Sequence, residues 1–114
     1  MATTGAKEGR CFSPEQARKT PLTPGDISSL LLAHGSMTLE YYAPKGSDPQ
    51  TPHTKDEIYI IAGGQGWFRC GSQRCAFGPG DALFVPAGVA HRFEEFSSDF
   101  ETWVVFYGPE GGEE

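Results

Sequence analysis

Basic residues are scarce in this chain, and they form no run of lysine or arginine. Only 9 Lys and Arg stand against 15 Asp and Glu, so the formal net charge is −6. Proteins that bind nucleic acid or anionic lipid through charge present basic patches, so this composition argues against both partners. No apolar stretch approaches the roughly 20 residues that span a bilayer, and residues 1–5 lack the apolar core of a signal peptide. A cytoplasmic location is therefore the default expectation.

Cysteine is also sparse, with residues at positions 11, 70 and 75. An odd number of cysteines without a secretory signal favours reduced thiols. Cys70 and Cys75 flank a predicted turn over residues 71–74, so they could face each other across a hairpin. The pair is either two small strand residues or, as a weaker hypothesis, a thiol-dependent or redox-sensing site. A zinc site would need two more ligands, and the neighbouring sequence offers none.

Glycine and proline, in contrast, are frequent, with 15 and 9 residues among 114. This composition indicates one domain of many short strands and turns. Ser13 and Gln16 bracket Pro14 in a capping box, which predicts a short helix. We divide the chain into an N-terminal segment with this helix (1–24), a β domain (25–107) and an acidic, flexible tail (108–114). The β domain is predicted to contain about eight strands, over residues 28–33, 37–43, 58–62, 67–70, 75–77, 82–85, 90–96 and 102–107.

Two histidine-containing stretches carry the strongest chemical signal. Residues 80–91 (GDALFVPAGVAH) predict a strand, a tight turn and a second strand that starts with a histidine. Residues 53–57 (HTKDE) run directly into the apolar segment 58–64. Two histidines and a carboxylate on separate short strands converge only if a barrel or sandwich brings them together. Such a set with open positions is the usual ligand set of mononuclear Fe(II), and it suits other divalent metals.

The later stretch resembles the second signature motif of the cupin superfamily. That motif runs from a glycine through Pro-x-Gly to a histidine and then an asparagine. Gly80, Pro86, Gly88 and His91 are all in register with it, and Glu95 stands where the motif has asparagine.

The earlier stretch resembles the first cupin motif. His53, Glu57 and Gly64 match its second histidine, its glutamate and its glycine, while Thr51 stands at the position of its first histidine. The resemblance covers roughly residues 25 to 107 and is closest to small single-domain cupins of the conserved-barrel type. It implies an all-β fold, a cupin-type antiparallel β-barrel or jelly-roll sandwich, here with a short N-terminal helix.

We expect His53, Glu57 and His91 to hold a divalent metal, which the resemblance suggests is Fe, Mn, Ni or Zn. Each residue has an alternative role. His91 would be a core histidine bonded to backbone, His53 an exposed loop residue, and Glu57 a partner that orients a histidine. A neutral hydroxyl such as that of Thr51 is a poor ligand, but three protein ligands still suffice for a catalytic site. Gln50 could supply a fourth contact if the loop shifts.

Strand alternation places Glu57 and Tyr59 on one face, and likewise His91, Phe93 and Glu95. If these faces point inward, the metal cluster lies at one end of a pocket with aromatic walls. Tyr59 and Glu95 are then the candidate catalytic groups for proton transfer. The candidate wall residues, not all of which can point inward, are Tyr41, Tyr59, Trp67, Phe84, Phe93, Trp103 and Phe106.

Two functions are compatible with these features. The first is a metal-dependent enzyme, such as a dioxygenase or an isomerase, that acts on a small organic metabolite. The second is a non-catalytic module that binds a small molecule and has a degenerate or absent metal site, which the missing first histidine favours. The alternation that turns Tyr59 inward turns Ile58 and Ile60 outward, where they need cover. We therefore also expect a homodimer.

Overall fold

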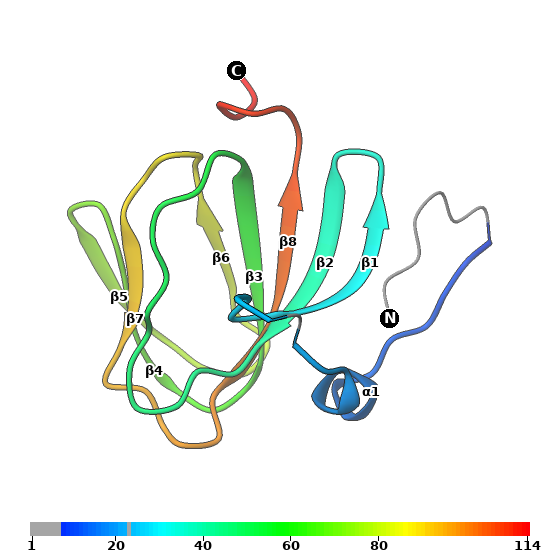
Figure 1. Cartoon of the computed structure of the whole chain (residues 1–114). Coiled ribbons are helices and arrows are strands. Elements are labelled where there is room, and N and C mark those ends of the chain that lie inside the picture. The colour runs from blue at the N-terminus through cyan, green and yellow to red at the C-terminus, as the bar shows by residue number, and fades with distance from the viewer. Residues whose placement is uncertain (1–7, 23) are drawn as a thin grey trace.

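The architecture is two antiparallel β-sheets that face each other, with one short helix outside them (Figure 1). This computed structural model describes residues 8–22 and 24–114. The larger sheet has the strand order β1-β2-β8-β3-β6, and the smaller one has the order β5-β4-β7. The all-β sandwich with a short N-terminal helix is therefore confirmed. Residues 1–7 and Thr23 of the predicted N-terminal segment lie outside the described residues.

The strands agree with the sequence expectation to within a few residues at their ends. The largest differences are β3 and β5, which begin earlier, and β7, which ends earlier. The elements are α1 (Pro14–Lys19), β1 (Ser29–His34), β2 (Met37–Tyr42), β3 (Asp56–Gly63), β4 (Gly66–Cys70), β5 (Gln73–Phe77), β6 (Ala82–Val85), β7 (His91–Glu94) and β8 (Glu101–Tyr107).

The core lies between the two sheets, as the period-2 alternation predicts. Along β3, Tyr59 and Ile61 are buried, whereas Ile60 between them is 38% exposed. Phe93 on β7 stacks against Tyr59 with ring centroids 4.8 Å apart, which joins the two sheets across the core. The remaining buried members of this cluster are Tyr42, Phe68, Phe77, Val85, Phe100 and Val104.

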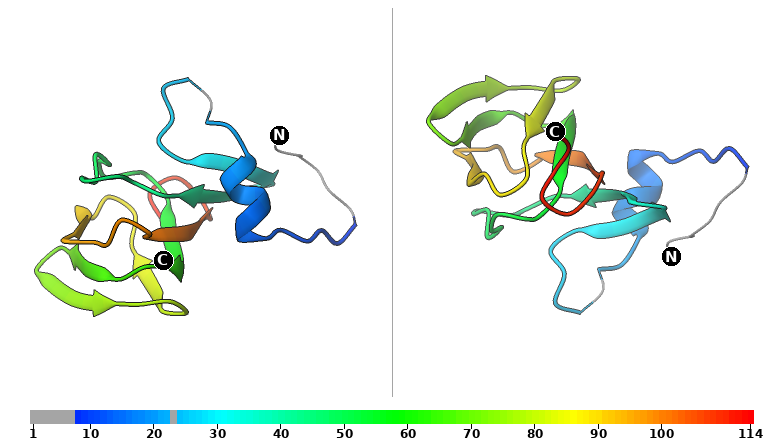
Figure 2. Two further views of the ribbon diagram at one scale, coloured as in Figure 1. Left: turned by 90° about the horizontal axis from the view of Figure 1, so that it is seen from below. Right: turned by 90° about the horizontal axis from the view of Figure 1, so that it is seen from above.

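The helix covers part of the outer face of the larger sheet (Figure 2). It begins with the predicted capping box, in which Ser13 and Gln16 bond to each other's backbone N–H groups. Ala17 on its inner side packs with Leu31 and Tyr41 in a second apolar cluster. With six residues it is far too short for a bilayer, and no helix of the described chain is long and apolar enough to cross one.

Four of the candidate wall aromatics point away from the interior. Tyr41 and Trp103 stack on each other at 4.8 Å in the cluster under the helix. Trp67 and Phe84 are exposed on the outer faces of the smaller and larger sheets. Only Tyr59, Phe93 and Phe106 are inward, which follows from strand alternation once the register of each strand is known.

The β4–β5 hairpin is tighter than predicted. Cys70 pairs with Gln73, so the turn has two central residues and not four. Gly71 has φ 58°, and Ser72 is not among the residues with positive φ, as expected for a type II′ turn. Cys75 consequently pairs with Phe68, two residues along β4 from Cys70, so the two cysteines are not directly opposite each other.

Residues of the C-terminal segment contact the start of β3. The N–H of Gly111 donates to the carbonyl of Thr54 at 2.7 Å, and the N–H of Glu113 donates to Asp56 at 2.8 Å. The other carboxylate oxygen of Asp56 accepts from the N–H of Ala87 at 2.9 Å. The segment ends beside the two motif loops, while the flexibility of residues 108–114 and the domain boundaries stay predictions.

Candidate metal centre

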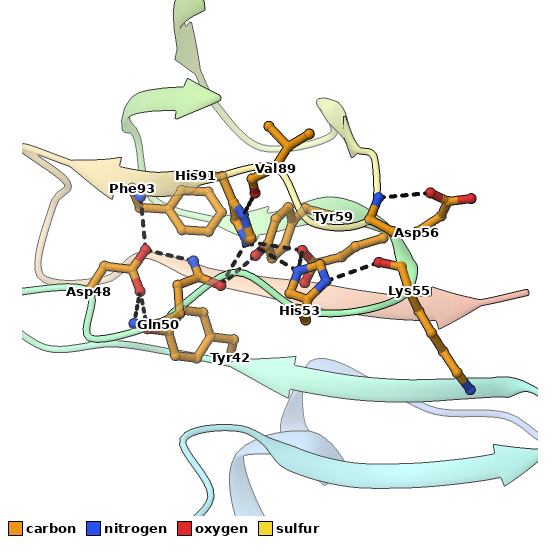
Figure 3. Close-up of polar contacts among 12 residues, drawn as sticks. Tyr42, Asp48, Gln50, His53, Lys55, Asp56, Tyr59, Val89, His91 and Phe93 are labelled. Carbon is orange, nitrogen blue, oxygen red and sulfur yellow. Dashed lines mark hydrogen bonds and ion pairs between the residues drawn. The ribbon is translucent and has the colours of Figure 1, made fainter. Parts of the chain in front are cut away.

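The three predicted ligands converge from both sheets of the sandwich. Figure 3 shows the two histidines among them side by side. His53 lies in the loop before β3, Glu57 lies on β3, and His91 is the first residue of β7. One ligand atom of each lies within 4.8 Å of the others. His91 and Glu57 are buried, and His53 is half-buried. Motif spacing alone therefore identified a real cluster of imidazole and carboxylate groups.

In its neutral form each histidine presents an unprotonated nitrogen to the cluster. The Nδ1 of His53 lies 3.0 Å from the carbonyl of Lys55, and the Nδ1 of His91 lies 2.9 Å from the carbonyl of Val89. A carbonyl oxygen only accepts, so each Nδ1 carries the proton. In the neutral rings each Nε2 therefore carries a lone pair, which is what a metal ion binds. The two Nε2 atoms are 3.3 Å apart.

Glu57 places its charge between the two rings. Its Oε1 lies 2.6 Å from the Nε2 of His53 and 3.2 Å from the Nε2 of His91. Burial raises the pKa of Glu57, but the hydrogen bonds and charges of both histidines outweigh burial and hold it below its ordinary value. Burial lowers the pKa of His53, yet the hydrogen bond and charge of Glu57 raise it above its ordinary value. The cluster thus favours a positive charge at its centre.

The position of His91 depends on the preceding turn. The N–H of Val89 donates to the carbonyl of Pro86 at 3.3 Å, and Gly88 has φ 79° at the third position of the turn. This is the type II geometry, in which glycine is preferred because its φ is positive. The turn brings the Val89 carbonyl to the Nδ1 of His91 and so fixes the tautomer.

A buried polar network lies beside the cluster, and of its members in the preceding loop only Gln50 was predicted, as a candidate fourth contact. Asp48, which is 4% exposed, accepts hydrogen bonds from the hydroxyl of Tyr42 and from the backbone N–H of Phe93. Gln50 donates to the same carboxylate, and its Oε1 lies 3.1 Å from the Nε2 of His91. Both residues belong to a loop rich in proline, glycine and serine that has no strand period. Only the identity of its polar residues could have drawn attention to them.

A cavity of about 490 Å³ opens beside the cluster, within the range of small-molecule sites. His53, Glu57 and Tyr59 form one end of it. Its walls come from the loop residues 25–28 and 49–51 and from β1, β2 and β8, which contribute Leu30, Thr38, Glu40, Tyr42, Val104 and Phe106. Glu40 is a second unpredicted polar residue. It accepts hydrogen bonds from Ser28 at 2.5 Å and Thr38 at 2.8 Å.

The two candidate catalytic residues are placed differently. Tyr59 is fully buried and donates to the Oε1 of Gln50 at 2.8 Å. Burial and the charge of Glu57 raise its pKa well above the ordinary value, so its hydroxyl stays protonated. Glu95 follows the end of β7 with φ 48°, and its side chain is 73% exposed and paired with Arg74. The structure therefore brings Tyr59 to the cluster and leaves Glu95 on the surface.

The cysteine pair has little of the character of a reactive site. Cys11, Cys70 and Cys75 are free thiols. Burial, and then the charges of Cys75 and Glu57, raise the pKa of the Cys70 thiol, which disfavours the nucleophilic thiolate. The interpretation as two small strand residues is the simpler one.

The family follows from comparison with known proteins. Residues 38–106 match the family model described as a cupin domain. The chain belongs to the cupin family. An uncharacterized protein of Streptomyces coelicolor, SCO3923, is 39% identical over 64 residues, which cover 56% of this chain and 61% of that protein. The match therefore spans less than two thirds of the relative's length.

Solved cupin-like structures agree with the fold. A cupin-2 domain protein of Shewanella frigidimarina has a TM-score of 0.64 at 13% identity and covers 82% of this chain and 90% of its own. A putative mannose-6-phosphate isomerase of Ralstonia eutropha has a TM-score of 0.62 at 22% identity. That match covers 91% of this chain and 100% of the isomerase chain. The DMSP lyase DddQ of Ruegeria pomeroyi has a TM-score of 0.57 at 23% identity. That match covers 81% of this chain and 53% of the lyase chain. At these identities the likeness shows the fold.

Proposed function

We propose that this cupin binds one divalent metal through His53, Glu57 and His91 and acts as a metal-dependent enzyme on a small organic metabolite. The observation that carries the proposal is the orientation of the two imidazoles. Both Nδ1–H groups are held by backbone carbonyls, so in the neutral rings both Nε2 lone pairs face the carboxylate of Glu57. Three acceptors that close together repel one another unless a proton or a cation lies between them. The donor set fits Fe, Mn, Ni or Zn.

A metal held here would polarise substrate oxygens, or bind O₂ if the reaction is oxidative. The chain itself supplies the space and the proton. The cavity beside the cluster admits a small molecule to the exposed side of His53. The hydroxyl of Tyr59 carries a proton at neutral pH, and Tyr59 is one of the residues that line the cavity. Tyr59 is therefore the group that would donate or relay a proton to a bound substrate.

The cavity also offers a feature for substrate recognition. Glu40 lies on its wall between the hydroxyls of Ser28 and Thr38, with apolar side chains such as Leu30 and Val104 around it. A carboxylate on the cavity wall favours a ligand that carries an N–H, an O–H or a cationic group. We accordingly expect a small, polar, metal-chelating metabolite.

The reaction class rests on the site, since the structural neighbours share the fold at low identity. The Ruegeria neighbour is a DMSP lyase, and the Ralstonia neighbour is a putative mannose-6-phosphate isomerase. Both names are compatible with the metal-assisted proton transfer that Tyr59 would serve. A dioxygenase or an isomerase acting on a small metabolite remains our proposal for this chain.

The second candidate is a non-catalytic cupin that binds a small molecule without metal. Thr51 favours it, because this residue occupies the motif position of the first histidine and is exposed. In that case the cavity and Glu40 would bind the ligand, and His53 and Glu57 would form an ion pair.

The deciding experiment is elemental analysis of the purified protein beside His91→Ala and Glu57→Ala. His34→Ala is the matched control, because His34 is exposed at the end of β1. We expect one metal ion per chain in the wild type and the control, and its loss in both cluster variants. A protein that holds no metal after reconstitution with Fe, Mn, Ni and Zn would support the second candidate instead.

A further inference from the structure

The amide of Gln50 has a fixed orientation. Its Nε2 donates to Asp48 Oδ2 at 2.6 Å, and its backbone N–H donates to Asp48 Oδ1 at 3.2 Å. A carboxylate only accepts, so the NH₂ group must face Asp48 and the Oε1 must point the opposite way. Gln50 is 9% exposed, so this orientation is set inside the protein.

The Oε1 of Gln50 points at the metal cluster (Figure 3). It lies 3.1 Å from the Nε2 of His91, which has no proton to donate when the ring is neutral. With a neutral His91 ring, the Gln50 oxygen and the His91 nitrogen are two acceptors with no hydrogen atom between them. The His91 Nε2 and the Glu57 Oε1, 3.2 Å apart, are a second such pair. The hydroxyl of Tyr59 donates to the same Oε1 at 2.8 Å and leaves it a second lone pair.

Asp48 anchors this amide to both sheets. It accepts from the hydroxyl of Tyr42 on β2 and from the N–H of Phe93 on β7, in addition to the two donors of Gln50. A carboxylate with four donors in a buried site is well compensated and rigid. The Gln50 oxygen is therefore held as firmly as a side chain on a strand.

We propose that Gln50 supplies the fourth protein donor to the metal, in place of the side chain at position 51, and that Asp48 is the positioning residue that aims its amide oxygen. The inference rests on the proposed metal binding. Amide oxygens bind hard and borderline divalent cations, so the complete set would be two imidazole nitrogens and two oxygens. Thr51, the motif position, is exposed and has no part in this set.

The test is titration of the metal-stripped protein with Co²⁺, followed by calorimetry and by visible absorption, which reports the ligand set. Gln50→Leu removes the oxygen at similar volume and should weaken Co²⁺ binding by about 10- to 100-fold and alter the spectrum. Asp48→Asn should weaken binding to a similar or smaller extent, because an asparagine amide lets Gln50 turn its NH₂ toward the metal. Thr51→Val is the matched control and should change neither quantity.

Melting curves of the metal-free variants separate ligation from folding. If Gln50→Leu does not fold, Gln50→Asn keeps the amide and withdraws its oxygen by one methylene, and it should show the same loss. Folded Gln50 variants with wild-type affinity and spectrum would overturn the inference while leaving the three-ligand site intact. A wild-type protein that binds no Co²⁺ would overturn the proposed function and, with it, this inference.

Discussion

The backbone N–H of Gly88 donates to the carbonyl of His53 at 2.7 Å. This single bond joins the turn of the second cupin motif to the histidine of the first. The same turn presents the Val89 carbonyl to the Nδ1 of His91 at 2.9 Å. One tight turn therefore positions two of the three candidate ligands, and the Pro-x-Gly spacing sets the site geometry as well as reversing the chain.

The glycine of the first motif leads to a prediction about packing. A Cβ at Gly64 would lie 2.4 Å from the Cα and 2.7 Å from the N of Phe100, which are backbone atoms that cannot move aside. Gly80 has a similar φ, 88° against 80°, but nothing lies within 4 Å of its Cβ position. We expect Gly80→Ala to cost about 1 to 2 kcal/mol through the left-handed backbone alone.

Gly64→Ala should cost more than about 3 kcal/mol, because the clash adds to the same backbone strain. The measurement is the free energy of unfolding from urea titration of both variants. Equal losses would show that Phe100 relaxes away and that only the backbone angle matters at this motif position.

The second prediction concerns the stability of the protein when Glu95, which stands where the second motif has asparagine, is replaced. Glu95 has φ 48°, in the left-handed region that asparagine adopts more readily than glutamate. Glu95→Asn should therefore raise the free energy of unfolding by up to about 1 kcal/mol. Glu95→Gln is the control, since it removes the charge that faces Arg74 and keeps the chain length. An asparagine variant no more stable than the glutamine variant would refute backbone strain as the cause.

The sequence could predict the three ligands but not their surroundings. His53, Glu57 and His91 follow from motif spacing, and the inward direction of Tyr59 follows from strand alternation. Alternation failed at Glu95 because β7 ends at Glu94, where the backbone turns left-handed. A period-2 argument holds only while the strand continues, and nothing local marks that end.

Gln50 was predicted as a candidate fourth contact, but the polar network that holds it was hidden for a different reason. Asp48 and Gln50 stand in an aperiodic loop, and such residues are usually solvated. Asp48 is held in the interior by hydrogen bonds from Phe93, which is far away in the sequence, and from Tyr42 on β2. Its burial could therefore be recognised only in the folded structure. Glu40 was not predicted because both faces of β2 are partly buried, one at the cavity and one under α1. The sequence of β2 therefore gives no clear distinction between a buried and an exposed face.

The attachment of α1 gives a prediction about pH. Arg18 makes two parallel bonds to Glu101 on β8, Nε to Oε1 at 2.9 Å and Nη2 to Oε2 at 2.6 Å. The hydrogen bond from Arg18 holds the pKa of Glu101 below its ordinary value of 4.5. A lowered folded-state pKa stabilises the protein above the ordinary value, and this contribution is lost as the pH falls through the folded-state pKa.

Arg18→Gln should therefore lower the thermal unfolding midpoint at pH 7 and have a smaller effect at about pH 3, because the contribution is lost as the pH falls through the lowered pKa of Glu101. Lys19→Gln is the control, because Lys19 pairs with Glu15 within the helix and both side chains are 75% exposed. A loss at pH 3 as large as that at pH 7 would mean that Arg18 acts through packing and not through its charge.

The outer face of β3 and β6 leads to the last prediction. Ile60 is 38% exposed and Phe84 is 55% exposed on this face, and β6 lies at the edge of the larger sheet. The sequence of β6 (ALFV) has no charged residue or proline to protect that edge. Each copy carries a net charge of −6, so two copies can approach most easily through an uncharged surface. We propose that a second copy covers this face in a homodimer with two-fold symmetry.

Sedimentation equilibrium at micromolar concentration should give the mass of a dimer for the wild type and of a monomer for Phe84→Glu, since a buried unpaired carboxylate at a two-fold interface is unfavourable twice over. Trp67→Glu is the matched control. Trp67 is 39% exposed, but it lies on the smaller sheet and stacks against Arg74, so its replacement should leave the dimer intact. A monomeric wild type would refute the homodimer. A dimer that Trp67→Glu breaks and Phe84→Glu preserves would instead place the interface on the smaller sheet.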